Sequence, residues 1–503
     1  MYSDPRIAEK GQIMKKRFLA GFLAALFLVS CAAENPVTPD EGQTPDVSAP
    51  EAEQAAEAVE EAPEAEIVTD DVPEIDFGRD TDLLMSEISW ASTNIIAEEM
   101  TGDLIGDAQF AMKMEMESRF NTTIRETYTA DIWSTAYVAR LVKAGDDAYA
   151  ACFVLDLYAP GYANAGLVMP LDQVPHIDIS KPYWDQALQP CVTIAGKNWF
   201  AFGCFDLSYY DLTHILTFNK DLLKDLNLEN PFDLVREDRW TLDAFASAAS
   251  AAVRDLDGDG TMTDADAWGF TSVAKQILPC FWMSAGEQSV AKDANDIPYL
   301  NVLGNERLYS VFEKLFAVMW DDGVWCPNTE DQNFWSGTVN MFGGGRALFA
   351  AQTFYYLSEF RDVEADFGIL PYPKFTEDQN GYHSRVEGGC KIAVIPVTNK
   401  QPEYAGALLE AMACYGFNNL IPEYYEIALK RKTSRDEESS AMLDLIFSTR
   451  SYDLGDTWWC NELRDGIFKP MFRDNDRDLT SAMQKKKKMV EKAIEKAIAE
   501  LAG

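Results

Sequence analysis

The sequence predicts an α/β protein whose folded body begins near residue 83. Beyond that point, amphipathic helical segments alternate with short runs rich in β-branched and aromatic residues, a pattern typical of helices packed on parallel strands. The 503 residues are 47% hydrophobic and 12% aromatic, which is enough to bury large cores. No repeat with a period of about 20 to 50 residues is visible, which argues against a solenoid or a propeller.

The elements can be assigned in chain order from their periodicity. Helices are predicted over 108–120, 135–144, 241–255, 306–321, 402–415 and 480–502, and strands over 151–157, 367–370 and 392–396. Thr241 is a suitable N-cap, and Trp240 precedes it as the apolar partner of the first helical turn. The lysine run 485–488 in the last predicted helix is interpreted as a solvated face.

The amino-terminal segment 1–31 has the pattern of a secretion signal. Lys15, Lys16 and Arg17 precede an apolar run that ends at Val29, and small residues follow it. The run is shorter than the roughly 20 residues that a transmembrane helix needs. Leu28 to Cys31 resembles the lipobox of bacterial lipoproteins, which implies that Cys31 is lipid-modified after the signal is removed.

Residues 32–82 are interpreted as an acidic, disordered tether. They carry 17 Asp or Glu against one basic residue, Arg79, and have few aromatic or β-branched residues. Such a segment cannot form a core, and its mutual repulsion keeps it extended. It would hold a globular body away from the membrane.

Charge and composition exclude several function classes. The formal net charge of −39 argues against binding to nucleic acid or to anionic membrane surfaces, because both need clustered Lys and Arg. Three widely spaced histidines leave little material for a His-based metal centre. The eight cysteines after Cys31 form no CxxC pair, and isolated buried thiols are slightly favoured over disulfides.

The segment 255–266 reproduces the spacing of an EF-hand calcium loop. Carboxylates at positions 1, 3 and 5, a glycine at 6 and a hydroxyl at 9 would surround one hard cation. The candidate ligands of this structural Ca²⁺ are Asp255, Asp257, Asp259, Thr261, Thr263 and Asp266. Asp266 stands where the motif has Glu, and its shorter arm should weaken the site. A plain acidic turn is the alternative.

Seven short sequence segments of the folded body, taken in order, resemble those of a known protein family. They are AGDDAY (144–149), LDQVP (171–175), KPYW (181–184), LTFNK (216–220), WTLDAF (240–245), FGGGRALF (342–349) and DFGILPYPK (366–374). By their order and spacing together, the chain resembles the bacterial extracellular solute-binding proteins of family 1. These are the lipoproteins that deliver sugars to ABC transporters.

The resemblance implies a periplasmic-binding-protein-like fold, with two α/β lobes joined by hinge crossovers and a ligand cleft between them. Lobe one would comprise 83–208 and 341–398, and lobe two 211–336 and 402–503. The implied function is that of a receptor that closes around a carbohydrate, expected to be an oligosaccharide, and presents it to the permease subunits of an ABC importer. It would be a monomer on the extracellular face of the bacterial cell membrane, held only by its lipid anchor.

We expect ligand contacts from aromatic rings, which cover sugar faces, and from polar groups, which pair with hydroxyls. The rings considered are Trp90, Trp133, Tyr158, Tyr209, Tyr210, Trp282, Trp335, Tyr355, Tyr356, Trp458 and Trp459. The resemblance places Tyr158, Trp282, Tyr355 and Glu387 in or beside loops at the cleft. Trp90, Tyr209 and Trp335 are further candidates, and the weaker polar candidates are Asp156 and Arg385.

Three alternative functions stay open. A surface glycosidase needs only two carboxylates, and acidic pairs are abundant here. The sequence contains neither GxSxG nor HExxH, and a protein that is not an enzyme is favoured. A binding protein of the same fold could take a polyamine or a peptide, and an adhesin or scaffold would bind no small ligand.

Overall fold

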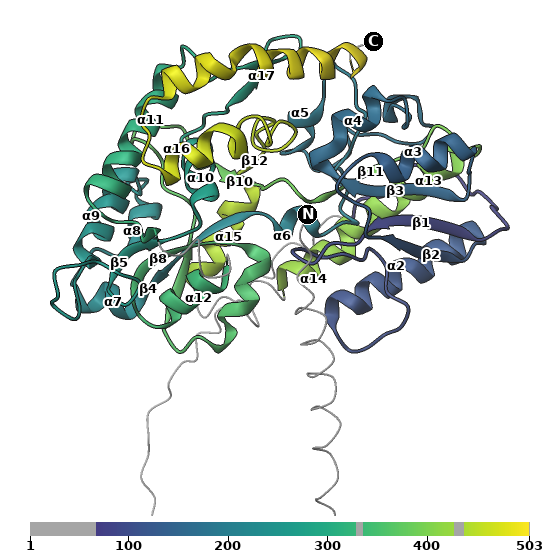
Figure 1. The fold of residues 1–503 in the computed structure, drawn as a ribbon. Coiled ribbons are helices and arrows are strands. Elements are labelled where there is room, and N and C mark those ends of the chain that lie inside the picture. The colour runs from purple at the N-terminus through teal and green to yellow at the C-terminus, as the bar shows by residue number, and fades with distance from the viewer. Residues whose placement is uncertain (1–66, 328–334, 427–436, 502–503) are drawn as a thin grey trace, which may run out of the picture. The chain divides into compact units, whose positions relative to one another are not determined.

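The computed structural model describes residues 67–327, 335–426 and 437–501. Its two principal sheets each carry helices and form the centres of two lobes (Figure 1). The signal segment 1–31 and most of the predicted tether lie outside the described residues. None of the helices in the described part of the chain is long and apolar enough to cross a membrane.

The first sheet has the strand order β11-β3-β1-β2. Its strands are β1 (Thr81–Ser86), β2 (Ile124–Thr129), β3 (Tyr149–Leu155) and β11 (Lys391–Val394). Strand β1 pairs in parallel with β2 and β3, and β11 runs antiparallel to β3. Helices α2 (Leu104–Phe120) and α13 (Pro402–Tyr415) share one buried core with this sheet, in which Phe120 and Leu408 lie with Leu83. This packing defines the first lobe.

The second sheet has the order β5-β8-β4-β9. Its strands are β4 (His214–Asn219), β5 (Trp268–Thr271), β8 (Ala347–Thr353) and β9 (Phe367–Leu370). Helix α9 (Leu242–Ala252) packs so closely on β5 that a Cβ at Gly269 would lie 2.3 Å from the carbonyl oxygen of Ala249. Only glycine permits this approach. Helices α12 (Trp335–Gly343) and α15 (Glu437–Ser448) pack on the strands β8 and β9.

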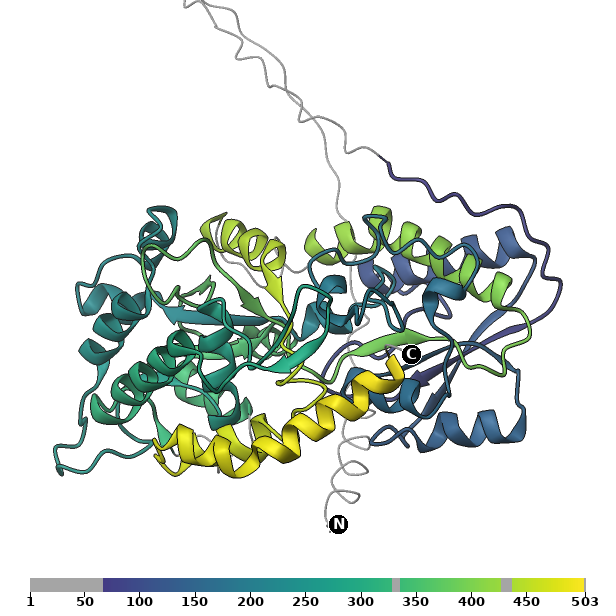
Figure 2. The ribbon, with the colours of Figure 1, turned by 90° about the horizontal axis from the view of Figure 1, so that it is seen from above.

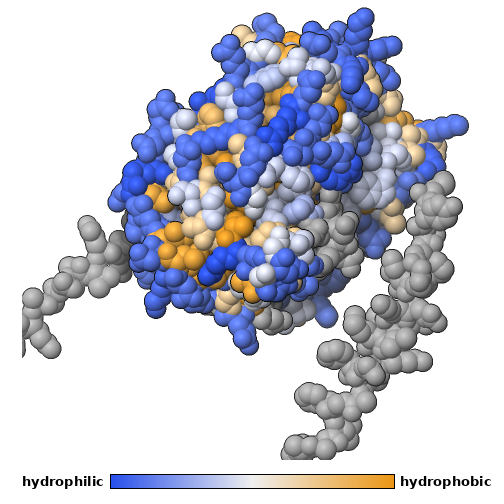
Figure 3. All heavy atoms as spheres, turned by 60° about the vertical axis from the view of Figure 1, so that its left-hand side comes forward, coloured by the Kyte–Doolittle hydropathy of each residue, from blue (hydrophilic) through white to orange (hydrophobic). Residues whose placement is uncertain are grey.

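The remaining elements surround the two sheets. The helices are α3 (Ala136–Ala144), α4 (Ala159–Asn164), α5 (Gln189–Val192), α6 (Ser208–Asp211), α7 (Lys220–Asp225), α8 (Pro231–Arg236), α10 (Ala274–Ser284), α11 (Glu306–Phe316), α14 (Ile421–Glu426), α16 (Lys469–Arg473) and α17 (Leu479–Leu501). Two short sheets pair β6 (Val290–Lys292) with β7 (Pro298–Leu300), and β10 (Ser384–Arg385) with β12 (Arg450–Ser451). On the face in Figure 3, hydrophilic residues surround smaller apolar patches, as expected for a surface in contact with water.

The fold class is confirmed, and each of the nine assigned helices and strands corresponds to an observed one, although 156–157 form a 3₁₀ turn after β3 and α9 ends at Ala252. The lobe boundaries are wrong in two places. Strands β8 and β9 lie in 341–398, which was assigned to lobe one, yet they pair with β4 in the second sheet. Helix α13 lies in 402–503, which was assigned to lobe two, yet it packs in the core of the first lobe. The reason is that the boundaries follow from the order of short family-like segments, and neither those segments nor periodicity shows which distant strand a given strand pairs with.

The predicted tether also ends earlier than expected. Residues 67–80, here called the amino-terminal strap, belong to the folded body. Asp70 forms two hydrogen bonds of 2.7 and 2.8 Å with the Arg119 guanidinium of α2. Phe77 stacks on Tyr404 of α13, with 3.4 Å between ring centroids. The acidic composition of 32–82 concealed these few anchoring residues, so the tether prediction is corrected at its carboxyl end.

Helix α17 connects the two lobes along one side (Figure 2). Near its start, Thr480 lies 3.1 Å from the Tyr309 hydroxyl of α11. At its other end, the Leu501 carbonyl accepts a 2.9 Å hydrogen bond from the Trp199 indole, and the helix packs on α4 beyond the end of β3. The lysine run 485–488 is exposed, as predicted.

Candidate ligand-binding site

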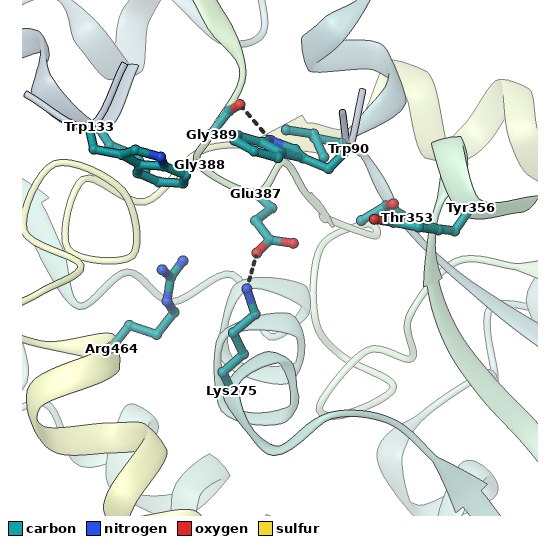
Figure 4. Close-up of a pocket in the computed structure, with 11 residues that line it drawn as sticks. Trp90, Trp133, Lys275, Thr353, Tyr356, Glu387, Gly388, Gly389 and Arg464 are labelled. Atoms are coloured by element: carbon teal, nitrogen blue, oxygen red, sulfur yellow. Dashed lines mark hydrogen bonds and ion pairs between the residues drawn. The ribbon is translucent and has the colours of Figure 1, made fainter. Parts of the chain in front are cut away.

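A cavity of about 330 Å³ lies beyond the carboxyl ends of the parallel strands in the first sheet (Figure 4). Trp90, Trp133 and Leu157 follow the ends of β1, β2 and β3. Ligands of α/β sheets typically bind at this edge. The other lobe completes the cavity, whose lining residues are Trp90, Trp133, Leu157, Leu212, Lys275, Thr353, Tyr356, Glu387, Gly388, Gly389 and Arg464.

Aromatic rings form one wall. The rings of Trp90 and Trp133 lie 5.5 Å apart with an angle of 31° between their planes. The Trp90 indole donates a 3.0 Å hydrogen bond to the carbonyl oxygen of Gly389, which fixes the ring, whereas Trp133 is 59% exposed. Figure 4 shows Glu387 between these rings and Lys275, with Tyr356 on another side. Flat rings of this kind can cover the apolar face of a sugar.

Glu387 lies at the polar end of the cavity. It belongs to the crossover between β10 and β11, and its Oε1 lies 3.0 Å from the Lys275 ammonium of α10. Its Oε2 accepts a 2.8 Å hydrogen bond from Gln276 and lies 3.1 Å from Nε2 of His214. Burial opposes ionisation, but Lys275, His214 and Arg385 together hold the pKa of Glu387 well below its usual range. The carboxylate is therefore charged at neutral pH.

A second layer of buried charges supports this end. Arg385 donates a 2.8 Å hydrogen bond to Asp456 through Nε, and its Nη1 lies 2.7 Å from His214. Arg464 donates to the carbonyl of Asp456 at 3.0 Å and holds Asp465 through two further bonds. The cations at the cavity are thus joined by a continuous network through the interior, which keeps their positions fixed.

Two of the seven predicted ligand contacts, Trp90 and Glu387, line the cavity. Tyr158 and Tyr355 are half-buried and do not belong to its lining. The predictions for Trp282 and Tyr209 are corrected, because both side chains lie in the core and are at most 2% exposed. The Trp282 indole donates to the Asp453 carboxylate instead. The side chain of Trp335 lies outside the described residues.

The weaker polar candidates have internal roles. Asp156 is fully buried and accepts hydrogen bonds from the Tyr452 hydroxyl at 2.6 Å and the Gly389 amide at 2.7 Å. Arg385 is also buried within the network that supports the cavity. Both side chains are buried outside the cavity, where they hold neighbouring residues of the site in place, and neither lines the cavity.

Several lining residues were missed. Trp133 and Tyr356 were among the rings considered, and their places after β2 and β8 were the available signal. Lys275 lies in the first turn of helix α10, and Arg464 begins a short π-helical turn, Arg464–Phe468, far along the chain. No local pattern marks either residue, because each reaches the cavity only through the tertiary fold.

The loop 255–266 gathers the expected carboxylates. Single oxygens of Asp255, Asp257 and Asp259 lie within 4.8 Å of one another at the surface. This all-oxygen donor set fits a hard cation such as Ca²⁺. Asp266 accepts hydrogen bonds from the amides of Leu256 at 2.8 Å and Thr263 at 2.7 Å, which lower its pKa. Its carboxylate therefore ties the two ends of the loop together.

No family model and no curated protein matches the sequence. Among solved structures, the sugar-binding protein MalE from Xanthomonas citri aligns with a TM-score of 0.58 at 12% identity, over 83% of this chain and 97% of that one. M. tuberculosis UspC aligns with a TM-score of 0.56 at 16% identity, over 82% and 99%.

A third solved structure is that of the ABC substrate-binding protein Lmo0181 from Listeria monocytogenes in complex with cycloalternan. It aligns with a TM-score of 0.53 at 11% identity, over 83% of this chain and 99% of that one. These identities are low, and what the three alignments share is the architecture of two α/β lobes. The described chain has the periplasmic-binding-protein-like fold of ABC substrate-binding proteins.

Proposed function

We propose that the protein is the solute-binding receptor of an ABC importer and that it takes a carbohydrate in the cavity between Trp90 and Glu387. The observation that carries the proposal is the cavity itself, which combines two adjacent indole rings with a fixed set of charged groups. This is the combination that sugar recognition requires. Solved structures of the same fold support it, among them the cycloalternan complex and a cyclo/maltodextrin-binding protein complexed with maltotetraose.

The size of the cavity determines how much of a ligand it can enclose. Its volume of about 330 Å³ is at the lower end of the range of about 300 to 1,000 Å³ found for small-molecule sites. We propose that it encloses one end of an oligosaccharide, with the remainder outside. Because both lobes line the cavity, a bound sugar would contact both and favour their closure.

The rest of the proposal concerns the location of the protein in the cell, its anchoring and its partners. The protein would be lipid-anchored through Cys31 on the extracellular face of the bacterial membrane, act as a monomer and pass its ligand to permease subunits. Mass spectrometry of the membrane-bound protein should find a lipidated Cys31. An unmodified, secreted form would contradict the anchor but not the binding function.

The binding function is tested with the soluble body, residues 67–503. We expect one class of glycan to raise its melting temperature, to bind in calorimetry without turnover, and to compact it in X-ray scattering. Trp90→Ala should weaken binding by about tenfold or more, because it removes one ring of the aromatic wall. Trp320→Phe, at a partly buried tryptophan that does not line the cavity, is the matched control.

Other results of these binding experiments would favour one of the alternative functions. Release of sugar products, abolished by changing one carboxylate, would favour a glycosidase. Binding of a polyamine or a peptide, with no response to sugars, would keep the fold and overturn the ligand class. No response to any small molecule would favour a scaffold.

We also propose that the loop 255–266 binds a structural Ca²⁺ ion. The convergence of Asp255, Asp257 and Asp259 supports this proposal, since three carboxylates this close repel one another without a cation. Thr261 and Thr263 are the remaining predicted ligands. The role of Asp266 in the proposed site would be to hold the loop closed around the ion.

A further inference from the structure

We propose that Asp211 and Lys391 are positioning residues for the aromatic wall of the cavity. They hold the loop 87–96, which carries Trp90, from two of the places where the chain passes between the lobes. This inference rests on the proposed carbohydrate-binding function and goes beyond it, because neither residue belongs to the cavity lining. It follows from the way in which the backbone of this loop is bonded.

The loop 87–96 follows β1 and contains neither helix nor strand. Its buried backbone groups therefore need partners in other segments, since a buried N–H or C=O without a partner is costly. At the end of the loop, Glu126 of β2 accepts hydrogen bonds from the amides of Ile95 at 2.7 Å and Ile96 at 3.1 Å. These bonds anchor the end of the loop to the first sheet, whereas the part beside Trp90 is held by other segments.

Asp211 holds the loop two residues beyond Trp90. Its Oδ2 accepts a 2.6 Å hydrogen bond from the Ser92 amide, and its Oδ1 accepts one of 2.8 Å from the Tyr424 hydroxyl of α14. Asp211 is 4% exposed and is the last residue of α6, which precedes β4 of the second sheet. The loop is therefore bonded at the point where the chain enters the second lobe.

Lys391 holds the next residue of the loop. Its ammonium group donates a 2.6 Å hydrogen bond to the carbonyl oxygen of Thr93 and lies 3.6 Å from the carboxylate of Asp206, and its side chain is fully buried. Lys391 begins β11, where the chain returns from the second sheet to the first. Two residues earlier, the Gly389 carbonyl accepts the hydrogen bond of the Trp90 indole (Figure 4). The return crossover thus holds both the backbone of the loop and its ring.

The two crossovers are also bonded to each other. The Lys391 amide donates a 2.9 Å hydrogen bond to the Ser208 hydroxyl of α6, and Asp206 accepts one of 2.8 Å from the Ser208 amide. Buried networks that include charged groups are strong and rigid. The Trp90 ring consequently has a fixed place in the cavity before a ligand arrives, so a sugar that packs on it would not pay to order the ring.

Hydrogen exchange tests the role of Asp211 without a ligand. Asp211→Ala should speed exchange of the amides in 92–96 by about tenfold or more while leaving β1 protected, because the Ser92 amide loses its acceptor. Asp211→Asn should behave like the wild type, since its amide oxygen can accept from Ser92 and its nitrogen can donate to the Tyr424 hydroxyl. Equal protection of the loop in Asp211→Ala and in the wild type would overturn the inference and leave the proposed function standing.

Calorimetry then measures the affinity for the tightest binder among maltotetraose, cellotetraose, mannotetraose and cycloalternan. Asp211→Ala should weaken binding by about tenfold, the scale of ordering one large side chain, and Asp211→Asn should bind within about threefold of the wild type. In the Asp211→Ala background, Trp90→Ala should cost less than about threefold, because the ring is no longer held in place.

Two results would overturn the inference while leaving the proposed function intact. One is an unchanged affinity in Asp211→Ala, and the other is an additive effect of Asp211→Ala and Trp90→Ala, since a residue that only stabilises the fold would not be coupled to the ring. Failure of every glycan to bind the wild-type protein would instead overturn both proposals.

A second variant tests Lys391. Lys391→Met keeps the aliphatic stem, and combining it with Asp206→Asn avoids leaving a buried carboxylate without its cation. This double variant should weaken binding as Asp211→Ala does. Lys374→Met is the matched control, because Lys374 is also fully buried and holds the Glu377 carbonyl at 3.0 Å outside the cavity lining. An equal loss of affinity in the control would contradict a positioning role for Lys391.

Discussion

Asp156 illustrates how a single buried carboxyl group links the lobes behind the cavity. It follows β3 in the first lobe, and it accepts hydrogen bonds from Gly389 and from the hydroxyl of Tyr452, which follows β12. Burial raises the pKa of Asp156 to about 6, although these hydrogen bonds oppose the increase. The folded protein therefore binds a proton here at a pH where the unfolded chain, with a pKa of about 3.9, has lost it.

A pH dependence of stability follows. Between about pH 4 and pH 6 the folded state holds more protons than the unfolded state, so this group lowers the free energy of unfolding as the pH rises. Asp156→Asn should remove that contribution, which amounts to about 3 kcal/mol for a shift of two pKa units. Denaturant unfolding of both proteins from pH 4 to 7 measures it. Part of the decrease in the free energy of unfolding with rising pH should remain in this variant, because burial also raises the pKa of Asp211 to about 6.

The control for this measurement is Asp476→Asn, at an exposed position. This change should leave the pH dependence of the free energy of unfolding as it is in the wild type. A slope equally steep in Asp156→Asn and in the wild type would show that Asp156 stays ionised in the folded protein.

At the scale of elements, the loop 255–266 lies between α9 and β5 and is tied to itself by backbone bonds. Asp255 accepts hydrogen bonds from the amides of Gly258 at 2.7 Å and Gly260 at 2.8 Å. Both glycines have positive φ, 74° and 81°, which other residues rarely adopt. The carboxylates are therefore held at the surface in a fixed turn.

We expect removal of calcium to lower the melting temperature of the protein. The proposed ion would be lost on chelation, and the three carboxylates would then repel one another. Asp257→Ala should abolish the sensitivity to chelator, whereas Asp264→Ala, in the same loop but outside the proposed ligands, should retain it. An unchanged melting temperature after chelation of the wild type would mean that the loop is only an acidic turn.

The sequence predicts a helix or strand well where the residues within that segment determine its secondary structure. Helix α13 begins at Pro402, a residue suited to the first helical turn, and the predicted range 402–415 matches the structure. The partners of β9 could not be predicted in this way, because they depend on packing with a strand some 150 residues away. The range 367–370 itself was predicted correctly.

The candidate site was predictable to a smaller degree. Glu387 is predicted because the family resemblance places it in a loop at the cleft, and Trp90 because it is an aromatic ring of the first lobe. The fold does bring the two together. Trp282 and Trp90 are chemically the same residue, and only the packing of α10 buries one of them. Lys275 gave no sequence signal, since its importance comes from contact with Glu387, more than 100 positions further along the chain.

At the scale of the whole molecule, Arg450 joins distant parts of the chain. It lies in β12, forms a buried ion pair with Asp185 near α5, and places its guanidinium over the ring of Tyr210 at 4.1 Å. Breaking a buried pair by removing one partner leaves an uncompensated charge, whereas removing both partners is less harmful. The pair therefore determines stability in a non-additive way.

Arg450→Met should lower the free energy of unfolding by about 3 to 5 kcal/mol, because it leaves Asp185 buried without its cation. Adding Asp185→Asn should recover part of this loss. Equilibrium denaturation of the two single variants and the double variant gives the coupling energy. If the double variant were as unstable as the sum of the single changes, the pair would not act as a unit.

The amino-terminal strap also has a mechanical consequence. Tension that travels along the chain from residues before 67 enters the body at the strap and reaches Asp70 with Arg119, then Phe77 with Tyr404, before it reaches β1. These contacts lie on the helices α2 and α13, so the load would be shared by side chains on the helical layer. The strands that position Trp90 and Trp133 would stay in register while the strap is peeled away.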